Sequence, residues 1–210
     1  MREIANKAER EKKYRFQNLY TMLKEINLLD SWKYLNKNAA YGLDNVSARE
    51  YEMSLIENVR ELVCRLKRKG YRAKLVKRKY IPKTKRKMRP LGIPATEDKL
   101  VQAASARILN AIYEQDFISD SYGYRNGKSA QTEIKELHYQ LQYGWFGHVV
   151  EADIKGFFDN LSHEWLIRML EERVNDKSFI GLIRKWLKAG IMESEKMVIH
   201  PATGTPQGGK

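Results

Sequence analysis

Apolar residues recur every three or four positions over much of the chain, a spacing that is typical of helices packed on a core. Residues 9–29 show this spacing and predict a first helix. Ser47 and Glu50 form a capping box, in which each side chain bonds the other residue's backbone N–H, and they predict the start of a second helix. We expect this helix to end at Gly70, since glycine commonly follows the last helical turn.

Further helices are predicted where a Ser, Thr or Asp residue precedes an apolar periodic segment, because these side chains cap the free N–H groups of a first turn. These helices are expected from Thr96, from Ser129, from Ser162 to about Arg173 and from Asp176 to about Gly190.

Strands are a minority and are predicted by short runs of β-forming residues. We expect a hairpin over residues 74–82 and 87–93, a strand from His148 to Ile154 and a second hairpin over residues 191–203. The predicted fold class is therefore α+β, rich in helices with short antiparallel strands.

Composition is compatible with a folded domain, since 42% of the 210 residues are hydrophobic. The single cysteine, Cys64, excludes an intramolecular disulfide and a zinc site built from cysteines, and we expect it to pack in or near the core. The N-terminus lacks the features of a signal peptide, and no apolar run is long enough to span a bilayer. We therefore expect a cytoplasmic protein with no membrane partner.

The net charge of +13 is concentrated in one segment. Residues 65–89 contain 14 Lys and Arg and no Asp or Glu, which leaves 13 − 14 = −1 for the remaining residues. Such clustering is typical of a site for nucleic acid or nucleotide phosphate. A solvated basic surface is the alternative interpretation.

Two carboxylates, Glu151 and Asp153, stand two residues apart in the predicted strand and would point to the same face. The negative charges of two such carboxylates repel each other unless water, a cation or a metal ion lies between them. Gly156, which follows shortly, would allow a ligand to approach the backbone closely. By themselves these acids could equally belong to an ordinary surface.

The sequence Ala-Asp-Ile-Lys-Gly-Phe-Phe-Asp at residues 152–159 resembles the first palm motif of bacterial reverse transcriptases, most closely those encoded by group II introns. Residues 80–94 resemble their basic fingers motif, residues 121–130 the motif after it, and residues 203–209 the loop beneath the incoming nucleotide. The four motifs occur in the family's order. Residues 36–44 are similar to the extra N-terminal loop of these enzymes.

This resemblance implies the fold of a right-hand polymerase. An N-terminal extension and fingers would occupy residues 1–147, and the start of the palm residues 148–175. Residues 176–210 would form a helix and a hairpin that return to the fingers and end in the Pro-Gln-Gly-Gly loop.

The resemblance also implies roles for individual residues in nucleotide transfer. Asp153, helped by the Ile154 carbonyl, would ligate the catalytic Mg²⁺ ions. Lys83 and Arg89 would hold the triphosphate of the incoming dNTP, with membership of the general basic patch as the alternative.

Other residues of the same motifs would shape the nucleotide site. Phe158 would lie under the sugar and exclude a 2′-hydroxyl, unless it is a core phenylalanine. Backbone amides near Gly156 and Phe157 could meet phosphate, and Gln207 would support the nucleotide and the template base. Asp159 is assigned no metal role, since it could instead begin a helix or pair with a cation.

Contacts to nucleic acid are implied for basic residues in two loops. These residues are Arg125 and Lys128, with Lys85, Arg86 and Lys87. The expected partners are an RNA template, a DNA primer, a dNTP and intron RNA. Aromatic residues near the basic segments, such as Tyr80 and Tyr122, could stack on bases or simply pack.

The chain also departs from the family pattern. The Tyr-Ala-Asp-Asp box that supplies the other metal-binding aspartates is absent, and no Asp-Asp pair occurs anywhere. We therefore expect a truncated protein that belongs to a family of RNA-directed DNA polymerases but is catalytically incomplete alone. An incomplete palm sheet would leave a free edge, so a homodimer is plausible.

Two alternatives to the group II intron polymerase stay open. The chain could be an RNA-binding maturase module, a splicing cofactor without polymerase activity. It could instead belong to the diversity-generating, retron or CRISPR-associated reverse transcriptases. The Leu-Gly-Ile-Pro sequence at residues 91–94 and the Gly-Lys-Ser-Ala sequence at residues 127–130 favour the intron type.

Overall fold

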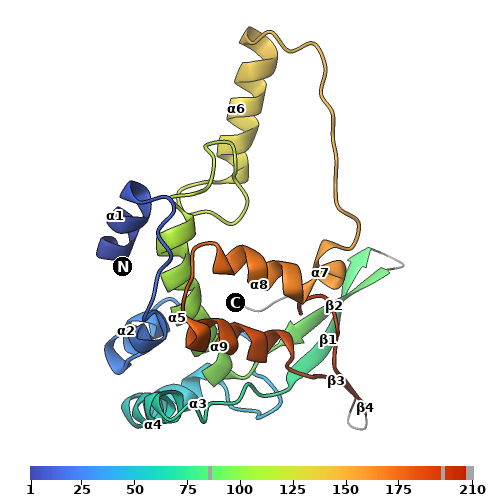
Figure 1. Ribbon diagram of the computed structural model, residues 1–210. Helices are drawn as coiled ribbons and strands as arrows, with labels where there is room; N and C mark the ends of the chain where they lie inside the picture. Colours follow the sequence, from blue (N-terminus) through green and yellow to red (C-terminus); the bar gives the residue numbers. More distant parts are fainter. Residues whose placement is uncertain (85–86, 195–196, 207–210) are drawn as a thin grey trace. The chain divides into compact units, whose positions relative to one another are not determined.

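A computed structural model describes residues 1–84, 87–194 and 197–206 (Figure 1). The chain divides into two compact units, and each is described by itself. The smaller unit contains Met1–Lys12 and Asn110–Lys155, and the larger unit contains Lys13–Leu109 and Gly156–Lys210. Within the described residues, no helix is long and apolar enough to cross a membrane.

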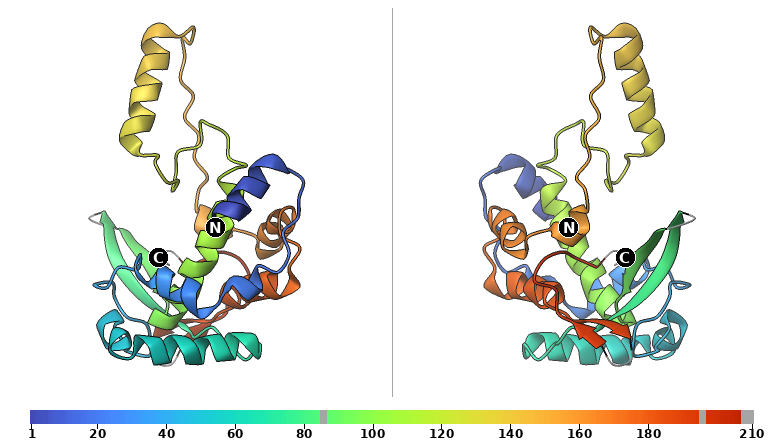
Figure 2. Two further views of the ribbon diagram at one scale, coloured as in Figure 1. Left: turned by 90° about the vertical axis from the view of Figure 1, so that its left-hand side faces the viewer. Right: turned by 90° about the vertical axis from the view of Figure 1, so that its right-hand side faces the viewer.

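The larger unit contains a four-stranded sheet with the order β2-β1-β3-β4, in which two hairpins meet (Figures 1 and 2). Both hairpins confirm the predicted ones. They pair in parallel where Val76 and Lys77 face Ile191 and Met192. The strands are β1 Val76–Thr84, β2 Lys87–Ile93, β3 Ile191–Ser194 and β4 Met197–Ile199.

Helices make up most of the rest of the larger unit. The helix predicted from Thr96 is confirmed as α5, and those capped by Ser162 and Asp176 are confirmed as α8 and α9. The helical elements are η1 Tyr20–Met22, α2 Glu25–Trp32, α3 Ala48–Met53, α4 Leu55–Lys67, α5 Thr96–Tyr113, α7 Phe157–Asn160, α8 His163–Glu171 and α9 Lys177–Leu187. The residues of α5 from Asn110 onward belong to the smaller unit.

The core of the larger unit is built on the apolar faces of these helices. Leu62 on α4, Leu100 on α5 and Phe179 on α9 expose none of their surface. Burying a side chain of this size contributes about 1.5–3 kcal/mol each to folding. The apolar residues that recur at helical spacing in the sequence therefore form the buried face of each helix.

The single helix predicted for residues 9–29 is wrong. Helix α1 (Arg2–Arg10) belongs to the smaller unit, and the chain then runs irregularly to η1. The N–H of Phe16 donates to the Arg173 carbonyl (2.7 Å), and the N–H of Asn175 donates to the Phe16 carbonyl (2.7 Å). This pairing with a distant segment uses backbone groups that a helix would need, and it overrides the local periodicity.

The helix predicted from Ser47 to Gly70 begins as expected but is interrupted. Both bonds of the capping box between Ser47 and Glu50 are present. Ser54 leaves the helical conformation (φ −126°, ψ 41°), and the Asn58 side chain donates to the Tyr51 carbonyl (2.9 Å) that the break exposes. The chain therefore forms α3 and α4 in place of one helix.

The expectation for Cys64 is wrong, since this residue of α4 is exposed. The core-facing positions of α4 are occupied by its neighbours Leu62, Val63 and Leu66. The same helical period that predicted the buried face thus places Cys64 outside it.

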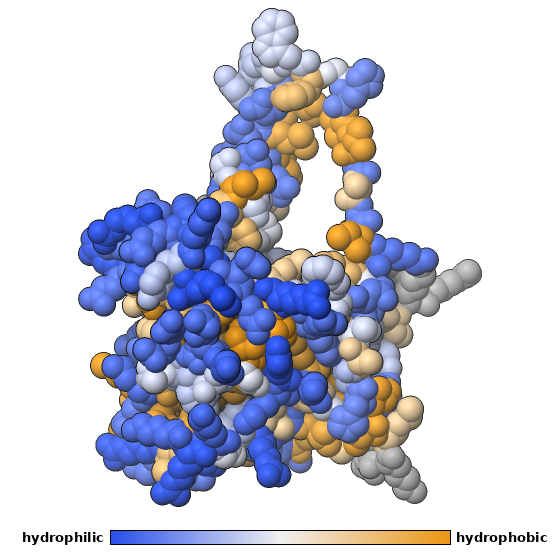
Figure 3. Space-filling model, in the orientation of Figure 1, coloured by the Kyte–Doolittle hydropathy of each residue, from blue (hydrophilic) through white to orange (hydrophobic). Residues whose placement is uncertain are grey.

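In the smaller unit, the helix predicted from Ser129 is confirmed as α6, Ala130–Tyr143. Its apolar positions Ile134, Leu137 and Leu141 are exposed. Figure 3 shows hydrophobic surface, in orange, along the part of the molecule that contains α6 and the segment that follows it.

The strand predicted for residues 148–154 is wrong, because the segment contains neither helix nor strand and its side chains are exposed. A strand is stable only when its backbone groups bond to a neighbour. In the part of the chain that the structure describes, no strand pairs with this segment. The shared face expected for Glu151 and Asp153 is therefore not formed.

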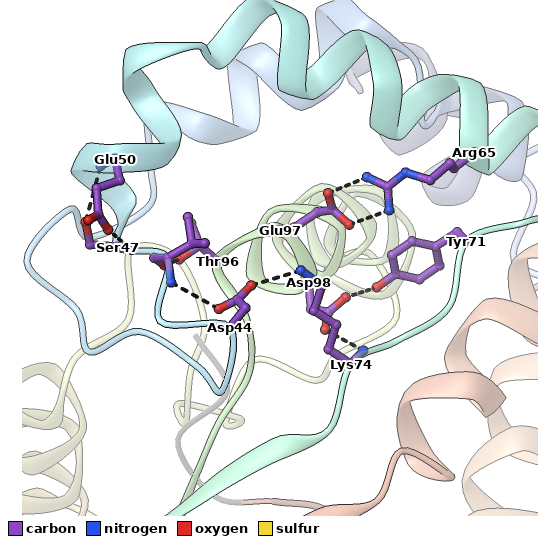
Figure 4. Close-up of polar contacts among 10 residues, drawn as sticks. Asp44, Ser47, Glu50, Arg65, Tyr71, Lys74, Thr96, Glu97 and Asp98 are labelled. Carbon is purple, nitrogen blue, oxygen red and sulfur yellow. Dashed lines mark hydrogen bonds and ion pairs between the residues drawn. The ribbon is translucent and has the colours of Figure 1, made fainter.

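A buried carboxylate at the start of α5 binds the segment that enters β1 (Figure 4), and through Tyr71 it is linked to α9. Asp98, which is only 2% exposed, accepts hydrogen bonds from the Tyr71 hydroxyl and from the Lys74 N–H (2.9 Å). The Tyr71 hydroxyl in turn accepts from Nε1 of Trp186 on α9 (3.0 Å). Burial is the main cause that raises the pKa of Asp98, to about 6.

Ion pairs surround this carboxylate on either side. Arg65 of α4 binds both carboxylate oxygens of Glu97, at 2.9 and 2.5 Å. Lys74 binds Asp44 (3.0 Å), which lies in the loop of residues 36–46. The first turn of α5 therefore fixes α4, this loop and the segment that enters β1 (Figure 4).

We predict that Asp98 makes the protein less stable as the pH rises. Its pKa is about 6 when folded and 3.8 in the unfolded chain, so between these values the folded state binds the extra proton. The contribution of Asp98 to the free energy of unfolding is largest below about pH 4, and it falls as the pH rises through 6. Asp98→Asn does not titrate, so from pH 7.5 to 5 the wild type should gain about 1 kcal/mol relative to the variant.

Urea denaturation at several pH values measures this difference. Subtracting the free energy of unfolding of the variant from that of the wild type removes the contribution of all other carboxylates. These include Glu50, whose lowered pKa acts in the opposite direction. A difference that stays constant across this pH range would contradict the prediction.

Candidate active site

The segment 156–160 makes a sharp turn into the short helix α7. Gly156 has φ +63°, in the left-handed region that favours glycine, and the Asn160 side chain donates to its carbonyl (3.0 Å). Phe157 and Phe158 follow, with their rings packed edge to face at 5.4 Å. Phe158 is 41% exposed, so the alternative that it is a core phenylalanine is wrong.

The loop of residues 203–206 is bound to this turn by backbone hydrogen bonds. The N–H of Thr205 donates to the Phe158 carbonyl (2.8 Å), and the N–H of Gly204 donates to the Leu161 carbonyl (2.8 Å). Nε2 of His163 lies 2.6 Å from the Gly204 carbonyl, a contact in which the ring nitrogen donates. The start of the last predicted motif is thus held against the end of the first palm motif and the residues that follow it.

Glycines make this approach possible. Gly204 has φ +82°, and a Cβ there would lie 2.7 Å from the carbonyl oxygens of both Phe158 and Asp159. On β2, a Cβ at Gly92 would lie 2.3 Å from Cβ of Pro206. Strand β2, the loop and the Phe158 turn therefore meet at distances that only glycine allows.

A hollow of about 100 Å³ lies between these segments. Its volume is well below the roughly 300–1,000 Å³ that encloses a small-molecule ligand, so it is not a complete nucleotide pocket. It is lined by Arg78, Pro90, Phe158, Asp159, Ile191, Pro201 and residues 203–206.

The charges at the hollow are largely balanced. Nε of Arg78 binds Glu193 (3.1 Å), and the Tyr80 hydroxyl donates to the same carboxylate. The hydrogen bond from Tyr80, followed by that from Arg78, lowers the pKa of Glu193. Arg78 is therefore occupied by an internal partner, and Tyr80 is held by its hydroxyl.

The predicted metal ligands lie in the other unit. Asp153 and Ile154 are exposed residues of the smaller unit, whereas Gly156, Phe157 and Phe158 belong to the larger one. Within the residues that the structure describes, no group of three His, Cys, Asp or Glu side chains could hold a metal ion.

The predicted triphosphate and nucleic-acid contacts of the basic hairpin are only partly described. Arg89 is exposed on β2 opposite Ile81 and has no acidic partner among the described residues. Lys83 lies in β1 and Lys87 in β2. The side chains of Lys83 and Lys87, and all of Lys85, Arg86 and Gln207, lie outside the described residues.

The predicted template contacts, Arg125 and Lys128, have internal partners. The Arg125 guanidinium, whose side chain is 10% exposed, binds Glu114 (2.8 Å) and the carbonyls of Ile118 (2.7 Å) and Ser121 (2.8 Å). Lys128 donates to the Ser119 carbonyl (2.7 Å). Both residues stabilise the loop before α6, so a template phosphate would have to displace existing bonds.

Two residues of this site were missed by sequence reasoning. These are His163, which binds the Gly204 carbonyl, and Gly92, which admits Pro206. A lone histidine at a helix start belongs to no sequence pattern that would mark it. Its contact with the Gly204 carbonyl forms only because the chain folds back to it more than 40 residues later. The close approach at Gly92 could have been suspected from a glycine inside a predicted strand.

Comparison with known proteins gives consistent matches. Residues 81–210 match the family model described as "Reverse transcriptase (RNA-dependent DNA polymerase)". The chain is 41% identical over 155 residues to "Group II intron-encoded protein LtrA" of Lactococcus lactis subsp. cremoris, covering 73% of this chain and 25% of that protein. It is 33% identical over 174 residues to "Protein YkfC" of Escherichia coli (strain K12), covering 80% of this chain and 45% of that protein.

A yeast protein and a solved structure extend these matches. "Putative COX1/OXI3 intron 1 protein" of Saccharomyces cerevisiae is 37% identical over 128 residues, covering 61% of this chain and 15% of that protein. A chain of the "Partial Cas6-RT-Cas1--Cas2 complex" has a TM-score of 0.52 at 24% identity, covering 90% of this chain and 31% of that chain. The likeness in fold confirms the predicted α+β class. The chain spans from about a seventh to under half the length of the relatives named here.

We predict that Gly204→Ala destabilises the protein by about 2 kcal/mol, since a side chain would be strained at this φ and would press on two carbonyl oxygens. Gly181→Ala in α9 is the matched control. Apart from its chain neighbours and the backbone of its own helix, no atom lies within 4 Å of its added Cβ, and replacing a helical glycine should stabilise by about 0.5–1 kcal/mol. Urea denaturation measures both variants, and equal stability of the two would contradict the described packing of the loop.

Proposed function

Because the chain belongs to the reverse transcriptase (RNA-dependent DNA polymerase) family, we propose that it supplies the incoming-nucleotide side of an active site for RNA-directed DNA synthesis. The matches to LtrA and to the yeast intron protein support the group II intron type. The observation that carries the proposal is the junction of the Phe158 turn, the loop of residues 203–206 and β2. These are three of the segments by which the family is recognised, and they lie far apart in the sequence.

The junction gives each proposed residue a physical role. The exposed ring of Phe158 offers an apolar floor for a deoxyribose and leaves no polar partner for a 2′-hydroxyl. Arg89, which has no acidic partner among the described residues, presents a cation from β2 for the triphosphate, and Lys83 is proposed to act with it. Gln207, one residue beyond Pro206, would support the base. Backbone N–H groups near Phe157 would meet phosphate.

This proposal keeps the division into fingers and palm. Residues 1–147 and 176–210 would form the N-terminal extension and fingers, and residues 148–175 the start of the palm. The template and primer would be RNA and DNA, with Arg125 and Lys128 exchanging their internal bonds for backbone phosphates.

Reverse transcriptases generally use Mg²⁺, which would neutralise charge on the phosphates. Asp153 and the Ile154 carbonyl are the proposed ligands of this chain. One carboxylate and one carbonyl do not fit a two-ion site by themselves, since the described residues contain no cluster of three ligands. The role that follows for this chain is to bind and orient the nucleotide.

We predict that the 210-residue polypeptide makes no cDNA by itself. With Mg²⁺, the four dNTPs and an annealed RNA template and DNA primer, extension should stay at the level without protein, because the chain contains no Asp-Asp pair to complete the metal site. Gel analysis of a labelled primer measures this. Robust primer extension by the purified polypeptide would refute the assignment of an incomplete metal site.

We predict that Arg89→Gln weakens dNTP binding about tenfold or more, since a charge-assisted bond to phosphate is worth about 1.5–3 kcal/mol. The measurement is anisotropy of a fluorescent dNTP in Mg²⁺ with an annealed template and primer present. Arg168→Gln removes an equal charge from α8, where Arg168 is paired with Glu164, and should change the affinity less than twofold. Similar losses in both variants would argue against a triphosphate contact at Arg89.

A further inference from the structure

The loop of residues 203–206 is held by hydrogen bonds of two kinds. Three of them end on backbone carbonyls, and these pairs are Gly204 with Leu161 (2.8 Å), Thr205 with Phe158 (2.8 Å) and Thr203 with Asp159 (3.3 Å). A fourth comes from a side chain outside the loop, since Nε2 of His163 donates to the Gly204 carbonyl (2.6 Å). Backbone carbonyls are present at every position, so of these four bonds the one from His163 requires a particular side chain outside the loop.

The peptide group between Gly204 and Thr205 is bonded at both ends. Its carbonyl accepts from His163, and its N–H donates to the Phe158 carbonyl (2.8 Å). Gly204 has φ +82°, and a glycine tolerates either orientation of such a peptide group because it has no Cβ. The two bonds therefore select one orientation and oppose rotation of the group.

The orientation of this peptide group sets the path of the chain that follows. Proline restricts the residue before it to extended conformations and fixes its own φ at about −65°, so Thr205 and Pro206 have little freedom. Pro206 packs on β2, where an added Cβ at Gly92 would lie 2.3 Å from Cβ of Pro206. The His163 bond thus acts, through two restricted residues, on the contact between the loop and β2.

His163 is attached to a well-fixed element, because it is the first residue of α8. Ile167, one turn later on the same face of the helix, is only 4% exposed. Just beyond α8, the backbone of residues 173–175 pairs with Phe16 (2.7 Å). Since Gly204 is buried, loss of the His163 bond would leave its carbonyl with little access to water, which is costly.

We propose that His163 is a positioning residue of the nucleotide site, which holds the Gly204–Thr205 peptide group and with it the loop beside Phe158. His163 is not among the described residues that line the hollow, whereas residues 203–206 and Phe158 are. It therefore acts through the loop and does not touch the nucleotide. The proposal rests on the proposed function for its ligand, a dNTP, while the hold on the loop is a property of the protein alone.

Two amide variants of His163 isolate the hydrogen bond from other effects of substitution. The amide nitrogen of Gln takes about the place of ring Nε2, whereas that of Asn, which is one methylene shorter, takes the place of Nδ1 and does not reach the Gly204 carbonyl. We measure anisotropy of a fluorescent dNTP with Mg²⁺ and an annealed template and primer. His163→Asn should bind about three- to tenfold more weakly, as expected for one hydrogen bond, and His163→Gln should stay within twofold of the wild type.

Amide hydrogen exchange, followed by NMR, tests the hold on the loop without any nucleotide. The N–H groups of Gly204 and Thr205 should exchange about three- to tenfold faster in His163→Asn than in the wild type, because the loop opens more often. In His163→Gln they should exchange at the wild-type rate. Equally fast exchange in both variants would show that any substitution loosens the fold, which overturns the proposal.

The wild-type chain provides a measurement that needs no variant. Since a carbonyl can only accept, the ring ¹⁵N shifts of the neutral His163 imidazole should place the proton on Nε2. A proton on Nδ1 would exclude the bond and overturn the proposal, even if thermal unfolding showed that His163→Asn does not fold.

The binding results have equally definite consequences. Wild-type dNTP affinity in a folded His163→Asn variant, or equal losses of affinity in the two variants, would overturn the role of His163. If the wild type binds no dNTP, the proposed function itself is wrong, and the ring tautomer and the exchange rates still decide whether His163 holds the loop.

Discussion

Two adjacent carboxylates at the start of α5 hold the larger unit together. Glu97 and Asp98 are almost completely buried, so removing them from water is costly unless each is fully hydrogen-bonded. Arg65 satisfies Glu97 with two bonds, and Tyr71 and the Lys74 N–H satisfy Asp98. These bonds fix where α4 ends and where the chain enters β1, and the rest of the sheet follows from that point.

The candidate active site depends on this position of β1. Strand β1 carries β2, and Gly92 on β2 admits Pro206, whose loop is bound in turn to the Phe158 carbonyl. A shift of β1 would therefore move the loop away from the Phe158 turn. The hollow is smaller than a nucleotide, so this framework orders the edges of a nucleotide site and not a closed pocket.

Features fixed by neighbours in sequence could be predicted, whereas those fixed by distant segments could not. Capping residues such as Ser47 and Asp176 marked helix starts because the capping bonds are local. The helix predicted for residues 9–29 failed because Phe16 bonds a segment more than 150 residues away. Motif resemblance located Phe158, but the internal partners of Arg125 depend on how residues 114–121 fold, which no pattern at Arg125 reveals.

The distribution of charge is a second feature that the sequence reveals only in part. The sequence shows that one segment holds the excess of positive charge, but only the structure separates neutralised cations from available ones. Tyr71 takes part in both the buried network and a contact of a basic residue. Its hydroxyl donates to Asp98, and its carbonyl accepts a hydrogen bond from Lys185 of α9. The residue whose hydroxyl helps to position β1, and with it the candidate active site, therefore also binds α9 through its carbonyl.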